Sequence, residues 1–343
     1  MRTHAERVVR LCGTPREIGV QMGARLGSRL DANIARYALE RAPAVPDAHE
    51  GAWRRGALHW LRSLPERYQE EFEGLAQGAG LELERVAQWG YLEILLSGAC
   101  SSAIVTLESR IWVARNNDFR APDLWGYTAI KEVPGRIPTI TFGMEGDVFT
   151  GTGVNREHLW LHYHYLPPPA AEPVTAAYLP CYLFLVEALE TCRSLAEVEA
   201  LLERLPRSAP MLLFAVDGEA CRHALYECGN TWHRPWEQGT AWRVGTNHSP
   251  AIPSERDASP LSSANRYARL TNRVESLVRS PAPRSAAEDL ISILGDPGIE
   301  RRDDDECTVY ANVACPSTGE LWYTFGGHPA ASRGEWHRLC WPW

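Results

Sequence analysis

Cys100 lies in an uncrowded run of small and hydroxyl residues, Gly98-Ala99-Cys100-Ser101-Ser102. Two small residues precede the thiol, so it has room to attack a carbonyl group, including that of the residue before it. A Cys, Ser or Thr at a newly made chain terminus can use its own α-amine, with a pKa of about 8, as the base. The run therefore fits a self-activating nucleophile, and it fits equally a half-buried cysteine at the start of a strand.

A polar triplet, Asn116-Asn117-Asp118, ends the next strand-like segment. A hairpin would place this triplet beside the start of the Cys100 strand. A carboxylate there could orient the terminal amine, and an Asn amide could donate a hydrogen bond to a substrate. The alternative is an ordinary turn, because Asn and Asp favour turn conformations.

Three further residues could complete an acyl-transfer site. Asn247 follows a strand-like segment and is a candidate oxyanion donor. His248 is next to it and could pair with a thiol as a base, although an isolated loop histidine is more often structural. Arg266 follows the serines that begin a helix, where it is either solvated or directed at a carboxylate such as Asp118.

His158, His162 and His164 are expected on one face of a strand, together with Trp160. His-x-His on a strand can bind a metal, but no carboxylate lies at a fixed spacing, so a pocket-lining role is favoured, with His162 as the candidate. Lys131 is the only lysine and sits in no phosphate-binding or Schiff-base motif. We expect no metal and no cofactor.

Composition sets the class of protein. The 343 residues are 45% hydrophobic and 23% charged, with a net charge of −8, which argues against nucleic-acid binding. No apolar signal segment opens the chain and no run is long enough to span a membrane. The nine cysteines are odd in number and irregularly spaced, so we expect reduced thiols and a cytoplasmic protein.

Hydrophobic periodicity predicts the elements that must position these residues. Helices are expected at 15–40, 53–64, 65–78, 81–96, 182–189, 195–205, 265–279 and 286–294, with a proline-rich loop at 42–47. Strands are expected at 5–10, 103–105, 111–114, 127–130, 139–142, 158–165, 211–216, 223–226 and 241–244, with a hairpin of 308–314 and 321–325. Strand blocks with helices before and between them predict stacked sheets covered by helices.

In order along the chain, several motifs resemble those of the acyl-coenzyme A:6-aminopenicillanic acid acyltransferase family, a cysteine-type group of N-terminal nucleophile hydrolases. Besides Cys100-Ser101-Ser102 and Asn116-Asn117-Asp118-Phe119, they are the runs at 13–19 and 71–80, Thr246-Asn247-His248, and the helix with Ser263, Arg266, Tyr267 and Leu270. The family more often has Gly where this chain has Ala99, and Thr where it has Ser101. It tends to be apolar or small at His158 and His162.

The resemblance implies an α+β fold, a four-layer αββα sandwich with two mainly antiparallel sheets, forming one domain over residues 1–343. The precursor would be cut before Cys100 into fragments 1–99 and 100–343, which stay associated. Asp118 would orient the new terminus, Asn247 would help form the oxyanion hole and Arg266 would hold the site. Ser101, Asn116, Asn117, His248 and His162 would support the site or bind substrate.

The activity implied is an autoprocessing amidohydrolase or acyltransferase of small-molecule metabolism. Its acyl donor would be an amide, an acyl-CoA or a carrier-protein thioester, and its acceptor an amine or water. No nucleic-acid or membrane partner is expected, and a homo-oligomer is left open. Two alternatives remain from the residues: an uncut thiol enzyme with His248 or a carboxylate as base, and a binding protein with the same fold.

Overall fold

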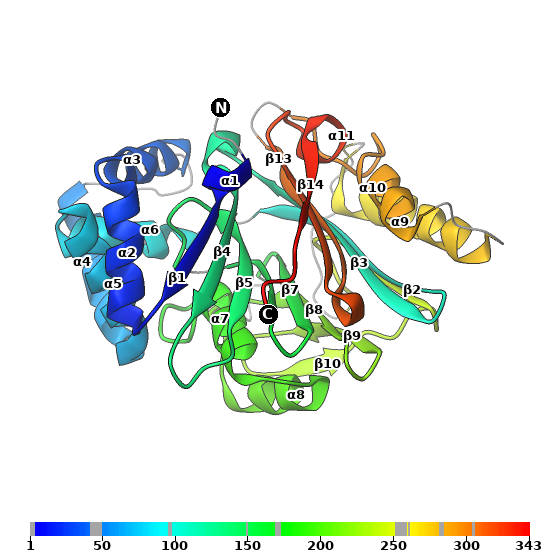
Figure 1. Ribbon diagram of the computed structural model, residues 1–343, viewed down its shortest axis with the longest axis horizontal. Helices are drawn as coiled ribbons and strands as arrows, with labels where there is room; N and C mark the ends of the chain where they lie inside the picture. Colours follow the sequence, from blue (N-terminus) through cyan, green and yellow to red (C-terminus); the bar gives the residue numbers. More distant parts are fainter. Residues whose placement is uncertain are drawn as a thin grey trace.

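Two β-sheets lie face to face in the computed structural model and form the centre of the molecule (Figure 1). The structure describes residues 4–41, 50–94, 98–148, 150–168, 173–250, 259, 261–280, 285–303 and 306–343. The expected loop at 42–47 lies outside the described residues. Among those described, no helix combines the length and apolarity needed to cross a membrane.

The first sheet has eight described strands, all antiparallel to their neighbours except that β1 runs parallel to β4. Their order is β1 (Val8–Cys12), β4 (Trp125–Glu132), β5 (Thr139–Met144), β6 (Thr152–Asn155), β7 (Leu159–Tyr165), β8 (Met211–Asp217), β9 (Arg222–Cys228) and β10 (His233–Pro235). We call it the large sheet.

The second sheet has six described strands and is antiparallel throughout. Their order is β11 (Trp242–Gly245), β2 (Ala99–Leu107), β3 (Arg110–Phe119), β12 (Cys307–Cys315), β13 (Glu320–Phe325) and β14 (Glu335–Leu339). We call it the nucleophile sheet, because β2 contains Cys100, the candidate nucleophile.

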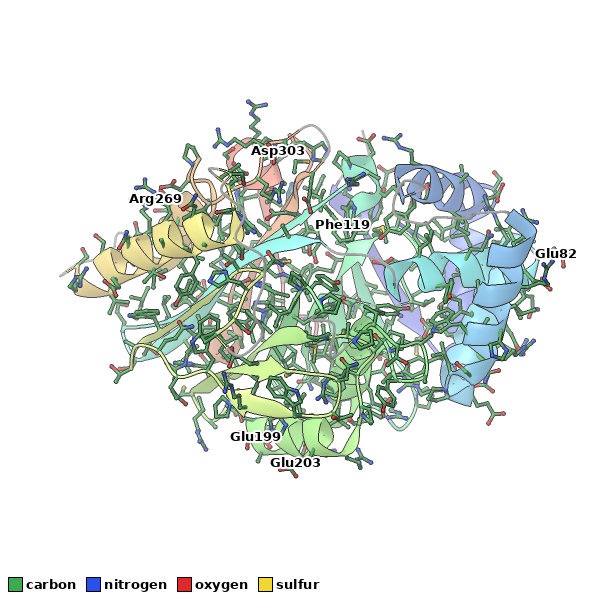
Figure 2. All side chains as sticks on the ribbon, turned by 180° about the vertical axis from the view of Figure 1, so that it is seen from behind. Glu82, Phe119, Glu199, Glu203, Arg269 and Asp303 are labelled. Carbon is green, nitrogen blue, oxygen red and sulfur yellow. The ribbon has the colours of Figure 1, made fainter. Side chains whose placement is uncertain are left out.

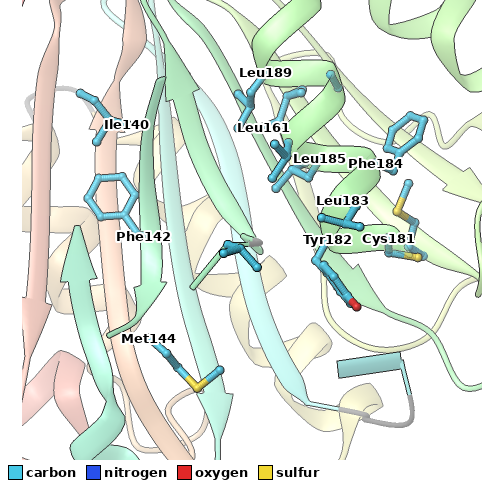
Figure 3. Close-up of a cluster of buried hydrophobic side chains, with 14 of the residues drawn as sticks. Ile140, Phe142, Met144, Leu161, Cys181, Tyr182, Leu183, Phe184, Leu185 and Leu189 are labelled. Atoms are coloured by element: carbon cyan, nitrogen blue, oxygen red, sulfur yellow. The ribbon is translucent and has the colours of Figure 1, made fainter. Parts of the chain in front are cut away.

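Helices cover the outer face of each sheet. On the large sheet, α7 (Cys181–Thr191) and α8 (Leu195–Arg204) pack against β6 to β9, and Leu161 of β7 lies beside Leu185 of α7 (Figure 3). Beside β1 lie the N-terminal helices α2 (Pro15–Leu26), α3 (Arg29–Arg41), α4 (Glu50–Ser63), α5 (Glu66–Ala79) and α6 (Leu83–Ile94). On the nucleophile sheet lie α9 (Ser263–Arg279) and α10 (Ala286–Leu294). The layer order is helix, sheet, sheet, helix, so the predicted αββα sandwich is confirmed.

Short elements complete the described chain. They are α1 (His4–Arg7), α11 (Ala330–Arg333) and the single turns η2 (Pro122–Leu124) and η3 (Pro316–Thr318). Periodicity missed the strands β6, β10 and β14, which are short and have a glycine or proline within them or next to them.

The two-residue period of β2 decides which layer each site residue faces. Ile104 belongs to the apolar cluster between the sheets, whereas Val105 belongs to the cluster under α9 and α10. Counting back along the strand places Cys100 in the layer between the sheets and Ser101 in the layer beneath α9.

The sequence motifs at 13–19 and 71–80 prove to be packing motifs. Thr14 caps α2 and exchanges hydrogen bonds with Glu17 in a capping box. A Cβ atom added at Gly19 would lie 2.1 Å from the Glu71 carbonyl oxygen, and one added at Gly74 would lie 2.1 Å from the Arg16 carbonyl oxygen. Glycine is therefore required at both positions, because α2 and α5 touch through their backbones.

Four local predictions were wrong. The strand expected over 5–10 spans Val8–Cys12 instead, and the residues before it form the short helix α1. The helix expected over 15–40 divides into α2 and α3, because Gly27 takes a φ of 54° and ends the first helix. The polar triplet at 116–118 is part of β3, not a turn, because β2 and β12 pair with it on both sides. His158 lies outside β7, which begins at Leu159, and it has a φ of 59° and stacks on Trp341.

Candidate active site

The β2–β3 hairpin brings the two chemistry-bearing runs together. In its register Cys100 pairs with Asn117 and Ala99 pairs with Asp118. The predicted neighbourhood of the thiol and the polar triplet is therefore confirmed. Sequence reasoning could find it because two consecutive strands joined by a short connection normally pair.

Arg115 is the charged neighbour of the thiol between the sheets. Its Nη2 lies 3.4 Å from the Cys100 Sγ and donates to the Asn117 Oδ1 at 2.9 Å. It also donates to the carbonyl oxygen of Tyr163 at 3.0 Å, and its Nη1 binds Gly151 and Thr152. Arg115 was not predicted as a site residue from the sequence. The signal was its two-residue spacing from Asn117, which puts both side chains on the face that carries the thiol.

The thiol itself is buried, with 5% of its surface exposed. Burial raises the pKa of the Cys100 thiol, and the Arg115 guanidinium opposes that rise. The Cys100 side chain is therefore a neutral thiol at neutral pH. A base must take its proton before it acts as a nucleophile.

Asn247 holds the backbone on both sides of Ala99. Its Oδ1 accepts the Cys100 amide N–H at 2.8 Å, and its Nδ2 donates to the carbonyl oxygen of Gly98 at 3.2 Å and to that of Tyr165 at 3.0 Å. The orientation of the amide follows from its partners, since an N–H needs an acceptor and a carbonyl needs a donor. Asn247 thus touches the atoms flanking the bond that would be cut.

Arg266 braces the other face of β2. Its Nη1 donates to the Cys100 carbonyl oxygen at 2.6 Å and to the Ser101 Oγ at 2.7 Å, and its Nη2 donates to the Asn247 Oδ1 at 3.0 Å. On α9 it shares the buried stripe of Leu270, Val274 and Leu277. Arg266 is therefore a buried residue of the site and not a solvated helix residue.

Asp118 is connected to the backbone of Cys100 through Arg266. Its Oδ2 lies 3.6 Å from the Arg266 Nη1, and its Oδ1 accepts a hydrogen bond from Thr308 at 2.6 Å. Burial raises the pKa of the Asp118 carboxyl, and Arg266 opposes that rise. The contacts place the carboxylate on the α9 side of the strand, behind the backbone of Cys100.

Other predicted residues support the site from further away. His248 Nδ1 contacts the Ser263 Oγ at 2.8 Å, and that oxygen also accepts the Asn247 N–H at 2.7 Å. Asn116 donates to the Leu294 carbonyl oxygen at 2.9 Å and ties β3 to the end of α10. Both residues therefore position the backbone that carries the site.

His162 lies in the layer between the two sheets. Its Nδ1 accepts the Trp160 indole N–H at 2.9 Å, and its ring stacks on Phe214. Within the described ranges no cluster of three or more His, Cys, Asp or Glu side chains is placed to hold a metal ion.

Glu306 and Phe119 constrain the residues before Cys100, and the sequence singled out neither as a site residue. The Ala99 N–H donates to the Glu306 Oε1 at 3.1 Å. A Cβ atom added at Gly98 would lie 2.4 Å from the ring of Phe119, which points into the interior (Figure 2). Only glycine fits at position 98 without displacing that ring.

A pocket opens onto the thiol, and both Cys100 and Gly98 line it. Its aromatic wall consists of Phe119, Trp125, Tyr163, Tyr165, Tyr182 and Tyr310. Such a wall suits a flat or apolar group whose carbonyl carbon is presented to the sulfur.

No family model matches this chain, and no curated protein matches it. Among solved structures, it is similar to a mutant of conjugated bile acid hydrolase from Clostridium perfringens, with 13% identity over 70% of this chain and 96% of that one and a TM-score of 0.47. It is also similar to the Caenorhabditis elegans ortholog of N-acylethanolamine-hydrolyzing acid amidase, with 14% identity, coverage of 64% and 93% and a TM-score of 0.48.

A third similar structure is penicillin V acylase from Agrobacterium tumefaciens, with 12% identity, coverage of 70% and 86% and a TM-score of 0.45. All three TM-scores lie below 0.5.

Proposed function

We propose that this protein is an N-terminal-cysteine amidohydrolase or acyltransferase that activates itself by cutting the Ala99–Cys100 bond. One observation carries the proposal: Asn247 binds the Cys100 amide nitrogen with its oxygen and the Gly98 carbonyl with its nitrogen. An asparagine that binds the backbone on both sides of Ala99 can hold this segment for cleavage. Once the segment has left, the same side-chain amide is free to bind the reacting groups of a substrate.

The processing step follows from the thiol's position. The Cys100 Sγ attacks the Ala99 carbonyl carbon, the C–N bond breaks, and the nitrogen takes up the proton that the thiol loses. Water then hydrolyses the thioester and leaves a carboxylate on Ala99 and a free amine on Cys100. The Asn247 Oδ1, which accepts the amide N–H in the uncut chain, would accept from this amine.

The mature site then needs no catalytic histidine. The α-amine takes the thiol proton, and the thiolate attacks the carbonyl carbon of an amide or thioester. The Asn247 Nδ2, released from Gly98 once the segment leaves, would donate to the oxyanion. The leaving amine or thiol takes the proton from the α-amine, and the thioester on Cys100 passes its acyl group to water or to an acceptor amine.

Contacts across the cut support fragments that stay together. β1 lies in 1–99 and pairs with β4 in 100–343. Ion pairs join the same two fragments: the buried pair of Glu71 and Lys131 at 2.6 Å and the partly buried pair of Arg67 and Glu187 at 2.8 Å. Removing one partner of a buried pair is costly, so the fragments should not separate without denaturant.

A denaturing gel tests the proposal. Purified wild-type protein should give two bands, the larger beginning at Cys100 by mass spectrometry, and Cys100→Ala should give one. Incubation with candidate amides and thioesters should leave an acyl group on Cys100. An intact chain that forms an acyl-enzyme would favour the uncut thiol enzyme, and a chain that neither cuts nor acylates would leave a binding protein.

A further inference from the structure

His164 joins the strand of the nucleophile to the loop of Asn247. On β7 of the large sheet, it is fully buried and faces the nucleophile sheet. Its Nε2 lies 2.7 Å from the Ser102 Oγ, two residues after Cys100 on the same face of β2. Its Nδ1 lies 2.8 Å from the carbonyl oxygen of Thr246, the residue before Asn247.

The two contacts fix the form of the imidazole. A carbonyl oxygen only accepts, so the Nδ1 of His164 carries the hydrogen. Burial lowers the pKa of His164 well below its usual range, with Arg115 acting in the same direction. The ring is therefore neutral, and its Nε2 accepts the Ser102 hydroxyl hydrogen. The ring thus donates to the Thr246 carbonyl oxygen on the Asn247 loop and accepts from Ser102 on the Cys100 strand.

We infer that His164 is a positioning residue that sets the Cys100 strand and the Asn247 loop at their working separation. The inference rests on the proposed function, because that separation matters when the thiolate and the Asn247 amide act on one carbonyl. Displacing a reacting group by about 1 Å can lower a rate a hundredfold. A planar ring held at both nitrogens allows less displacement than apolar packing does.

His162, two residues before His164 on β7, serves as a comparison for the contacts of His164. His162 is equally buried on the same face of β7 but binds Trp160 of its own strand. It joins no two parts of the site. The assignment to His164 therefore depends on the two hydrogen bonds and not on burial of an imidazole in this layer.

Two isosteric variants separate the two bonds. His164→Asn keeps an amide nitrogen near the Nδ1 position and loses the contact with Ser102, whereas His164→Gln keeps an amide near the Nε2 position and loses the contact with Thr246. Each should lower kcat about tenfold with KM unchanged, since about 1.4 kcal/mol, the scale of one buried hydrogen bond, corresponds to a factor of ten. Ser102→Ala should reproduce His164→Asn, and the double variant should add no further loss.

Asn155→Ala is the matched control. Asn155 is buried in the large sheet and donates two hydrogen bonds of 2.8 Å to the end of α7, on the helix side of that sheet. It should lower the melting temperature without changing kcat. If the His164 variants lose no more kcat than Asn155→Ala at an equal loss of melting temperature, the inference is wrong and the proposed function stands. If wild-type protein forms no acyl-enzyme, both fail.

Discussion

Arg266→Met should destabilise the protein far more than a change at an exposed arginine of the same helix. The side chain is 1% exposed, faces the equally buried Asp118 and donates to the backbone of Cys100. Methionine fills similar space but leaves the carboxylate buried without its cation. Breaking a buried pair in this way costs about 3–5 kcal/mol.

The pH dependence of that loss tests its cause. Burial already raises the pKa of Asp118, and Arg266 opposes the rise, so removing Arg266 should raise the pKa further. A carboxyl whose pKa is higher in the folded state binds a proton on folding, and the resulting stability is lost as the pH rises through the folded pKa. The deficit of Arg266→Met should therefore be larger at pH 8 than at pH 5.

Urea unfolding measures these free energies, in a Cys100→Ala background so that every chain is uncut. Adding Asp118→Asn to Arg266→Met should recover about 1–3 kcal/mol of the loss and abolish its pH dependence. Arg279→Met, at an exposed position at the end of α9 where the side chain makes one ion pair of 3.4 Å with Glu275, should change stability little. The reasoning is refuted if Arg266→Met costs no more than Arg279→Met, or if the double variant loses the sum of its single variants.

Three further changes have outcomes that follow from the contacts. Gly98→Ala should slow cleavage and lower the free energy of unfolding by about 1–3 kcal/mol, because the added methyl group overpacks against Phe119. Adding Phe119→Leu should restore the cleavage rate, measured on a gel, and the stability, measured in urea. If the second change restores neither, the steric explanation is wrong. Glu306→Ala should slow cleavage because the Ala99 N–H loses its acceptor, whereas Glu306→Gln should cleave at close to the wild-type rate; equal rates for both variants would rule out the hydrogen bond. Burial lowers the pKa of His162 well below its usual range. As the pH falls below about 6.5, the unfolded chain therefore binds a proton at His162 and the folded chain does not. This difference should lower the free energy of unfolding by about 1.4 kcal/mol per pH unit. His162→Gln should flatten that slope in urea titrations between pH 7 and 5, and an unchanged slope would exclude the assignment.

Much of the fold could be predicted, because helices and strands depend on local sequence patterns. The helical period before Cys100 and the two-residue period after it predicted helices followed by stacked sheets. Adjacency along the chain predicted that Asn117 and Asp118 would lie beside Cys100. The division at Gly27 was missed, because the apolar period continues across a glycine whose positive φ ends the helix.

The side on which each residue acts was decided only by the tertiary structure. The sequence by itself determined the nucleophile candidate, its carboxylate and amide partners, and the pairing of their strands. It did not show that Arg115 faces the thiol while Asp118 lies behind the backbone, or that His164 spans the two sheets. Those relations depend on strands far apart in sequence stacking with one register and one facing side, and strand pairing by itself does not fix how two sheets stack.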